Sequence, residues 1–305
     1  MASLLSGLTP PDPYLPPDLE REIFEIAALS DTRFIPRLLL VAQRVKTWIE
    51  HLLYRVLCVS APRLIRGSLR IPHRNLLDIL DLRPANFLAH TRHLSLTCTL
   101  TVDDTVHLLS HCDGIVNLGL FQFQVDATQH TLLSALAKLK LERLATDVES
   151  LFPEGVDFTH IIFAQITHLD LLRPPTADDP HAWAEGCAQL PHLTHISFTA
   201  PPIRIVDPIS DSAFRTILRG ILRRCARIEV LVLIVISSQL REYMLQHLYF
   251  ADDPRSVLMA AYTFSNSSFD DWERGARGGE DHWMRAERFV KQRLSGEVEE
   301  SEYFI

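Results

Sequence analysis

Four residues in the first half of the chain have types and a spacing that could hold a metal ion. Asp103, His107 and His111 follow one another at intervals of four residues, and Cys112 comes directly after them. Side chains four positions apart in a helix lie on one face, and zinc accepts carboxylate, imidazole and thiolate ligands. The sequence offers no opposing ligand for this group. We therefore interpret it as a solvated helix face and predict no metal site.

Motifs of the common enzyme classes are absent from the sequence. There is no Gly-x-Ser-x-Gly, no Gly-rich nucleotide loop and no His-Glu-x-x-His. One basic strip has no interleaved aromatic residue to stack on bases, so we interpret it as a solvated helix face: Arg215, Arg219, Arg223, Arg224 and Arg227. The net charge of −8 also opposes general binding to nucleic acid. We predict no enzyme activity, no cofactor and no nucleic-acid partner.

Composition and cysteine spacing indicate a folded protein of a reducing compartment. Of 305 residues, 47% are hydrophobic and 22% charged, which suits a chain with a real core. The longest apolar stretch, 228–236, contains Glu229 and is far shorter than the roughly 20 residues of a membrane span. We expect no signal peptide, no membrane partner and a cytoplasmic or nuclear location. The cysteines are scattered, which favours packed, reduced thiols: Cys58, Cys98, Cys112, Cys187 and Cys225.

A pattern of apolar-x-x-apolar-x-apolar recurs along the middle of the chain. Its central apolar positions, called marker positions below, are Leu94, Leu118, Leu144, Leu169, Ile196, Leu231 and Leu258. Successive markers are 24 to 27 residues apart, apart from one step of 35 that contains a proline-rich loop. Leucine-rich repeats have periods of roughly 20–29 residues. The spacing therefore predicts stacked strand-turn-helix units.

Helical patterns fill the intervals between these predicted strands. They cover Asp103 to His111, Ala127 to Leu139, Asp178 to Gln189, Ser210 to Ala226 and Gln239 to Leu248, whereas Thr146 to Gln165 is expected to be irregular. We predict an α/β fold in which residues 61–264 form an irregular leucine-rich-repeat-like solenoid with a parallel sheet and outer helices. A doubly wound α/β sheet is the alternative. It is less favoured because the period is regular and no Gly-rich loop follows the first strand.

The residues that alternate with the markers should line the concave face of such a sheet. Solenoids bind partners through such concavities, so we predict a target-binding surface there. Histidine recurs directly before the marker in three repeats. The alternative is that solvent-facing strand positions merely tolerate polar residues. The predicted surface comprises His93, Ser95, Asn117, Phe121, Arg143, His168, Asp170 and His195.

The last strands break this polar pattern, because Val230, Val232 and Ile234 would be apolar on the same face. An exposed apolar patch of this kind needs a cover. We predict that residues 265–305 form a helical cap followed by a loose acidic tail. One helical stripe can supply the cover: Trp283, Ala286, Phe289, Val290 and Leu294. The alternative is a free arm that becomes ordered only on a target.

Residues 1–60 form a separate helical module in this interpretation, with three short helices in 15–59. Pro17 suits a first helical position. Leu19, Ile23 and Ile26 then make one apolar stripe. The module carries more apolar surface than a core of this size needs, so we expect it to dock on a partner.

The module resembles the F-box motif, in particular the variant common in mushroom-forming fungi. The resemblance lies in Leu15-Pro16-Pro17-Asp18-Leu19 with Ile23-Phe24, in Leu39-Leu40-Val41-Ala42-Gln43-Arg44 and in Trp48-Ile49. Many F-boxes have a cysteine and a tryptophan where this chain has Ala42 and Val45, and Trp48 lies one helical turn later. The resemblance implies binding to a Skp-type adaptor, and through it to a cullin. The residues expected at that contact are Leu15, Pro16, Leu19, Ile23, Leu39 and Val41.

Taken together, these patterns favour the substrate-recognition subunit of a Skp-cullin-F-box ubiquitin ligase, which binds an as yet unknown target protein through its solenoid. A solenoid scaffold that acts outside a ubiquitin ligase is the alternative. An enzyme is the least favoured class.

Overall fold

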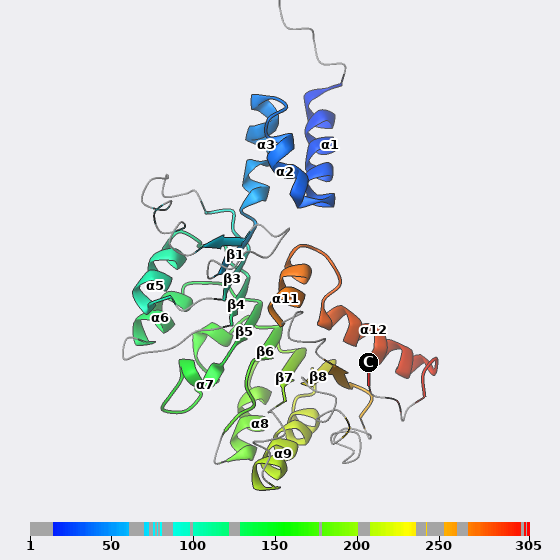
Figure 1. Ribbon diagram of the computed structural model, residues 1–305. Helices are drawn as coiled ribbons and strands as arrows, with labels where there is room; N and C mark the ends of the chain where they lie inside the picture. Colours follow the sequence, from blue (N-terminus) through cyan, green and yellow to red (C-terminus); the bar gives the residue numbers. More distant parts are fainter. Residues whose placement is uncertain are drawn as a thin grey trace, which may run out of the picture. The chain divides into compact units, whose positions relative to one another are not determined.

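The computed structural model of the 305-residue chain has an α/β fold. It describes residues 15–60, 70–72, 76, 78, 80, 88–97, 100–121, 129–176, 179–200, 208–235, 242, 253–260, 268–299, 302 and 304–305. The chain divides into a small helical unit, whose described part ends at Arg55, and a larger unit built on one parallel sheet (Figure 1). Within the described ranges, no helix is both long and apolar enough to cross a membrane.

The helical unit contains α1 (Pro17–Ser30), a 3-10 turn η1 (Thr32–Phe34), α2 (Ile35–Leu38) and α3 (Gln43–Leu53). Its core is a small cluster of Ala28, Ile35, Val45 and Ile49. A two-pronged hydrogen bond from Arg44 on α3 to the carboxylate of Glu20 on α1 joins the two longer helices. The module was predicted to extend to residue 60. The structure instead places Val56–Ser60 in the sheet, because this apolar run pairs with two other strands.

The larger unit holds nine described strands that are all parallel. They are β1 (Val56–Ser60), β2 (Arg70–Pro72), β3 (His93–Thr97), β4 (Asn117–Leu120), β5 (Arg143–Thr146), β6 (His168–Leu171), β7 (His195–Thr199), β8 (Val230–Val235) and β9 (Ser256–Ala260). Their order is β2-β1-β3-β4-β5-β6-β7-β8-β9. From β3 to β9 each strand therefore pairs with the next one in the chain. The order changes direction once, because β2 and β3 lie on opposite sides of β1, as in the doubly wound order 2-1-3-4-5. From β3 onward it runs in one direction, as in a solenoid.

The strand register confirms six of the seven marker positions. Leu94, Leu118, Leu144, Leu169, Ile196 and Leu231 lie opposite one another in consecutive strands. The seventh position is wrong, because Ser256 lies opposite Leu231 and Leu258 pairs with Leu233 two residues later. Leu57 of β1 pairs with Leu94, so the row begins one strand earlier than the pattern predicts.

Helices follow most strands, as the sequence predicts. They are α5 (Val102–Ser110), α6 (Gln129–Leu136), α8 (Pro180–Ala188) and α9 (Pro208–Arg224). The irregular third interval holds only α7 (Val148–Leu151) and a 3-10 turn, η2 (Ile161–Phe163). The helix predicted at 239–248 lies outside the described residues, except for residue 242. Two further helices, α11 (Ser268–Ala276) and α12 (His282–Ser295), lie on the side of the sheet opposite α5, α6 and α7 (Figure 1).

The four described cysteines are packed in the interior, as predicted from their spacing. Cys58, Cys112, Cys187 and Cys225 are buried free thiols, and Cys98 lies outside the described residues. Burial raises the pKa of Cys112 to about 12 and that of Cys225 to about 11. Such thiols stay protonated and unreactive at neutral pH.

Replacing a marker leucine is expected to destabilise the sheet unit strongly. Leu169 is 0% exposed, so Leu169→Ala should lower the free energy of unfolding by about 2–5 kcal/mol. Chemical denaturation measures this loss. Leu294→Ala is the matched control, because Leu294 is 66% exposed and a surface change costs less than about 0.5 kcal/mol. Equal, small losses in both variants would contradict the core position of Leu169.

Candidate functional site

Most residues predicted to bind an adaptor lie at the surface of the helical unit. Leu15, Leu19, Ile23 and Val41 are exposed large apolar side chains, and Pro16 is exposed. Leu39 is different, since it is half-buried and packs against the small core of the unit. The exposed apolar surface is wider than the motif suggests. It also includes Ile26, Leu29, Phe34 and Leu40.

The residues predicted to bind a target are brought together by the strand register. His93, Asn117, Arg143, His168 and His195 lie opposite one another in consecutive strands and form one row across the sheet. A second row, two residues further along each strand, contains Ser95 and Asp170 and also includes Gly119, Ala145 and Ser197. Phe121 directly follows β4. One face of the sheet thus gathers side chains from five strands.

The expectation that this face lies open to solvent is wrong, because α11 and α12 cover it. Phe269, Trp272 and Ala276 of α11 form a cluster with Val56, Cys58 and Ala145, with Phe121 packed against it. Ser95, Asn117, Asp170 and His195 are consequently buried. A concave binding surface lined by these residues is therefore occupied by the chain itself.

The predicted cap over the last strands is confirmed. Val230, Val232, Ile234, Val257 and Met259 form one buried cluster with four residues of α12, which are Trp283, Ala286, Phe289 and Val290. Leu294, predicted to share this stripe, is exposed instead, because it lies near the end of the helix at Ser295. The chain end is also not entirely loose, since the backbone of Ile305 hydrogen-bonds to Leu258 and Ala260.

The polar residues of the covered face find partners on the covering helices. The indole Nε1 of Trp272 donates to the side-chain oxygen of Asn117 at 2.9 Å. Arg143 pairs with Asp281 at 3.4 Å. Within the sheet, the Ser197 hydroxyl donates to the carboxylate of Asp170. Buried polar groups cost stability unless they are paired, so these contacts make the cover compatible with a polar face.

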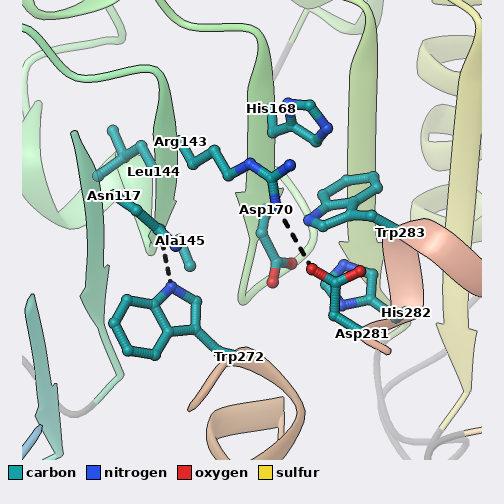
Figure 2. A pocket seen from close by; sticks show the side chains of 10 residues that line it. All are labelled: Asn117, Arg143, Leu144, Ala145, His168, Asp170, Trp272, Asp281, His282 and Trp283. Carbon is teal, nitrogen blue, oxygen red and sulfur yellow. Dashed lines mark hydrogen bonds and ion pairs between the residues drawn. The ribbon is translucent and has the colours of Figure 1, made fainter. Parts of the chain in front are cut away.

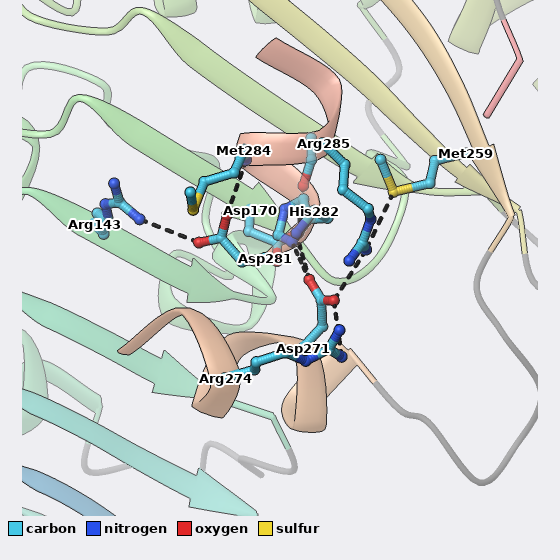
Figure 3. Close-up of polar contacts among 10 residues, drawn as sticks. Arg143, Asp170, Met259, Asp271, Arg274, Asp281, His282, Met284 and Arg285 are labelled. Atoms are coloured by element: carbon cyan, nitrogen blue, oxygen red, sulfur yellow. Dashed lines mark hydrogen bonds and ion pairs between the residues drawn. The ribbon is translucent and has the colours of Figure 1, made fainter. Parts of the chain in front are cut away.

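A charged network joins α11 to the first turn of α12 (Figure 3). The carboxylate of Asp271 accepts from the backbone N–H of His282 at 2.6 Å, from its Nδ1 at 3.0 Å and from Arg285 at 2.9 Å. Burial alone would raise the pKa of Asp271, but these donors and their charges lower it to about 2. Burial opposes the charged form of His282, yet its bond to Asp271 and the nearby carboxylates raise its pKa. The network therefore fixes the junction between the two helices.

Two histidines of the predicted surface, His168 and His195, stack on each other. Their ring centroids are 4.1 Å apart and the planes differ by 8°. Trp283 of α12 meets both rings edge-on, at 5.3 and 5.7 Å. Burial lowers the pKa of His168 to about 2 and that of His195 to about 4, so both rings are neutral at physiological pH.

A cavity of about 20 Å³ lies beside this pair, beneath the junction of α11 and α12 (Figure 2). Its lining includes Asn117, Arg143, His168, Asp170, Trp272 and His282. A volume of this size and polarity accommodates about one water molecule. This space is therefore too small to admit an organic substrate.

A larger cavity, of about 530 Å³, lies at the irregular third interval. Its lining includes the aromatic residues Phe152, Phe158 and Trp183. Its acidic residues are Glu149, Glu154 and Asp179. This cavity was not predicted from the sequence. The available signal was the concentration of aromatic residues in an interval that the sequence predicts to be irregular.

The metal-ligand group considered from sequence does not converge. Asp103 and His107 are exposed, whereas Cys112 is buried in the interior. Among the described residues, a different group brings ligand atoms together: His168, His195 and Glu287, the last from α12. No spacing in the sequence could indicate this group, because the carboxylate comes from a helix about 90 residues after the second histidine.

No protein-family model matches the chain, and no curated protein matches it significantly.

Proposed function

We propose that this chain is the substrate-recognition subunit of a Skp-cullin-F-box ubiquitin ligase, with residues 15–55 as an F-box-like docking module. The observation that carries the proposal is the exposed apolar surface of α1, where Leu19, Ile23 and Ile26 are each about half exposed. Residues at i, i+4 and i+7 share one helix face. The core of this unit is a small cluster around Ala28, and these three residues lie outside it. An exposed apolar face of this kind is expected to bind a partner.

The larger unit would then act as a leucine-rich-repeat-like solenoid that holds a target. Its parallel strands, which follow chain order from β3 to β9, and its aligned marker leucines support this interpretation. The ligase would gain from a raised effective concentration of the target lysine, with no covalent chemistry in this subunit.

The position of α11 and α12 constrains how a target could bind. The row from His93 to His195 becomes available only if these helices leave the sheet. A target bound to the intact unit would use another surface, and the cavity lined by Phe152, Phe158 and Trp183 is one that needs no rearrangement. Target recognition through the histidine row is therefore proposed only for a state in which α11 and α12 are displaced.

Co-purification with a Skp-type adaptor tests the docking module. The double variant Leu15→Ala/Pro16→Ala and the single variant Ile23→Glu should each abolish co-purification, because they remove exposed apolar contacts or place a charge among them. Circular dichroism should show unchanged helix content in both variants. Glu22→Gln is the matched control, since Glu22 is an exposed neighbour on the same helix, and it should bind like the unchanged chain.

Two outcomes would contradict the proposal. Adaptor retained by both apolar variants would place the contact elsewhere. A full chain that never co-purifies with the adaptor would favour the alternative function, a protein-interaction scaffold that acts outside a ubiquitin ligase.

A further inference from the structure

The cavity lined by Phe152, Phe158 and Trp183 is built by the two chain segments that follow the neighbouring strands β5 and β6. The first segment passes through α7, and the second reaches into the first turns of α8. The volume of about 530 Å³ lies within the range of about 300–1,000 Å³ that is typical of ligand pockets. No residue of α11 or α12 lines the cavity, so its use requires no displacement of these helices.

One wall of the cavity is a tight turn from Phe152 to Gly155. The backbone N–H of Gly155 donates to the carbonyl oxygen of Phe152 at 3.0 Å, which closes the turn. Pro153 fixes φ at its first central position, and Gly155 has a φ of 115°, which residues with a side chain rarely adopt. The turn therefore holds Glu154 in the lining while leaving this residue exposed.

The aromatic wall of the cavity is held by rings of the interior. Phe163 is only 1% exposed and stacks on both Phe152 and Phe158, with ring centroids 5.8 Å apart in each pair. Phe158 also meets Trp183 of α8 edge-on at 5.1 Å. A Cβ on Gly186 would overlap the Phe158 ring, so this glycine lets the ring lie directly on α8. The wall is therefore formed before any ligand arrives.

The charged residues of the lining are all acidic. They are Glu149, Glu154 and Asp179, and the lining contains no lysine, arginine or histidine. Glu149 accepts from the backbone N–H of Thr176 at 2.8 Å and from its hydroxyl at 2.5 Å. Asp179 accepts from two backbone N–H groups in the first turn of α8. These donors are neutral, so they orient the carboxylates without cancelling their negative charge.

The positive groups nearby are already matched elsewhere. Arg173 lies outside the lining and pairs with Asp147 at 3.3 Å. The positive end of the α8 dipole, about half an elementary charge, is complemented by Asp179 at the N-cap. Glu149 and Glu154 therefore line the cavity without a cationic partner among the described residues. Charge complementarity favours a cationic ligand.

We propose that this cavity binds a basic segment of the target protein, with an arginine side chain inside the cavity. The inference rests on the proposed function, because it assigns the cavity to the target that the ligase subunit would hold. An arginine side chain packs its apolar stem on an aromatic wall and keeps its charged head beside carboxylates. Its planar guanidinium also pairs with a carboxylate through two parallel hydrogen bonds. Glu154 and Asp179 are exposed and can meet further basic residues of the same segment.

Binding of a labelled peptide to the full chain, followed by fluorescence anisotropy, tests the proposal. The probe is a short peptide with blocked ends that carries two arginines between glycines. The comparison peptide carries citrulline in place of arginine, which preserves the shape and removes the charge. We expect saturable binding of the arginine peptide and at least about tenfold weaker binding of the citrulline peptide, because its charge-assisted hydrogen bonds are lost. Added salt should weaken the arginine peptide's binding.

Paired variants of the full chain locate the binding site. Ala182 is exposed and lines the cavity, so Ala182→Trp should fill the space and abolish binding without removing a buried group. Ala188→Trp is its control, because Ala188 is exposed on the same helix outside the lining. Glu154→Gln should weaken binding about 2- to 5-fold, the effect of one exposed charge pair. Glu297→Gln removes an equal charge from an exposed residue outside the cavity and should have no effect.

The proposal is overturned if the citrulline peptide binds as tightly as the arginine peptide or if Ala182→Trp retains binding. It is also overturned if Glu297→Gln weakens binding as much as Glu154→Gln, because attraction to the net charge of −8 would then explain the signal. Free argininamide that binds as tightly as the peptide would identify a small cationic ligand in place of a protein segment.

The outcome is separable from that of the adaptor experiment, since no measurement on the peptide involves the adaptor. Lost peptide binding with retained adaptor co-purification would refute the cavity's assignment and leave the docking module in place. Specific peptide binding by a chain that never co-purifies with the adaptor would refute the ligase function and with it the assignment of the segment to a ligase target.

Discussion

A chain shortened to end at residue 267 is expected to lose its stable fold. The truncation removes α11 and α12 and uncovers two apolar clusters on one face of the sheet, one around Val232 and Met259 and one around Val56 and Cys58. Removal of a single buried aromatic side chain costs about 3–5 kcal/mol. The segment contributes four such residues, Phe269, Trp272, Trp283 and Phe289, whereas a whole domain is stable by only about 5–15 kcal/mol.

The shortened chain should therefore aggregate or melt far below the full chain in a thermal scan followed by light scattering. A chain that ends at Ser295 is the graded control. It keeps both helices and loses only the contacts of the tail, such as those of Val298 and Ile305 with the cluster on β8 and β9. A peptide of residues 268–305 added in trans should partly restore solubility. A shortened chain as soluble and heat-stable as the full one would contradict the cap and favour a free arm.

The strands and their register could be predicted from sequence because the burial of apolar side chains dominates their formation. Leu94, Leu118, Leu144 and Leu169 are all at most 1% exposed, and transfer of such side chains from water is the largest favourable contribution to folding. Their regular spacing carries over to the register because each unit repeats the same strand position. The pattern fails where burial does not distinguish apolar from polar positions. In β9 both Ser256 and Leu258 are buried, so the apolar residue does not identify the aligned position.

The first strand was missed for a related reason. Val56, Leu57, Cys58 and Val59 are all buried, so the run has no alternation of apolar and polar residues that would mark a strand. Strands covered on both faces have such continuous apolar runs. The run also continues directly from α3, whose apolar residues Leu52 and Leu53 made it look like the end of a helix.

The burial of the predicted target-binding surface could not be predicted from sequence. The contacts that cover this surface join residues that are distant in sequence. Trp272 bonds to Asn117 across 155 positions, and Arg143 to Asp281 across 138. No local period encodes such a pair. A polar strand position looks the same in sequence whether it meets water or a matched partner, so polarity alone suggested solvent. The aromatic residues of the C-terminal segment did indicate a cover, but only over the apolar end of the sheet.

Trp283→Ala is expected to be the most damaging single change on α12. The indole is 5% exposed and belongs to the cluster that joins α12 to β8 and β9. It also meets the rings of His168 and His195 edge-on. Loss of the buried side chain and the cavity left behind should reduce the free energy of unfolding by about 3–5 kcal/mol. Aromatic pairs of this geometry add about 0.5–1.5 kcal/mol beyond burial.

Two companion variants show whether the loss arises from the position of Trp283 or from any change in this turn. Met284→Ala alters the next residue of the same helix, and its side chain is 50% exposed, so its cost should stay within about 0.5 kcal/mol. Trp283→Phe keeps an aromatic ring against the histidines and should fall between the two. Denaturant unfolding followed by fluorescence and circular dichroism measures all three. If Trp283→Ala were no more damaging than Met284→Ala, α12 would not be held to the sheet through this side chain, and the cover would depend on α11 and the Asp271 network instead.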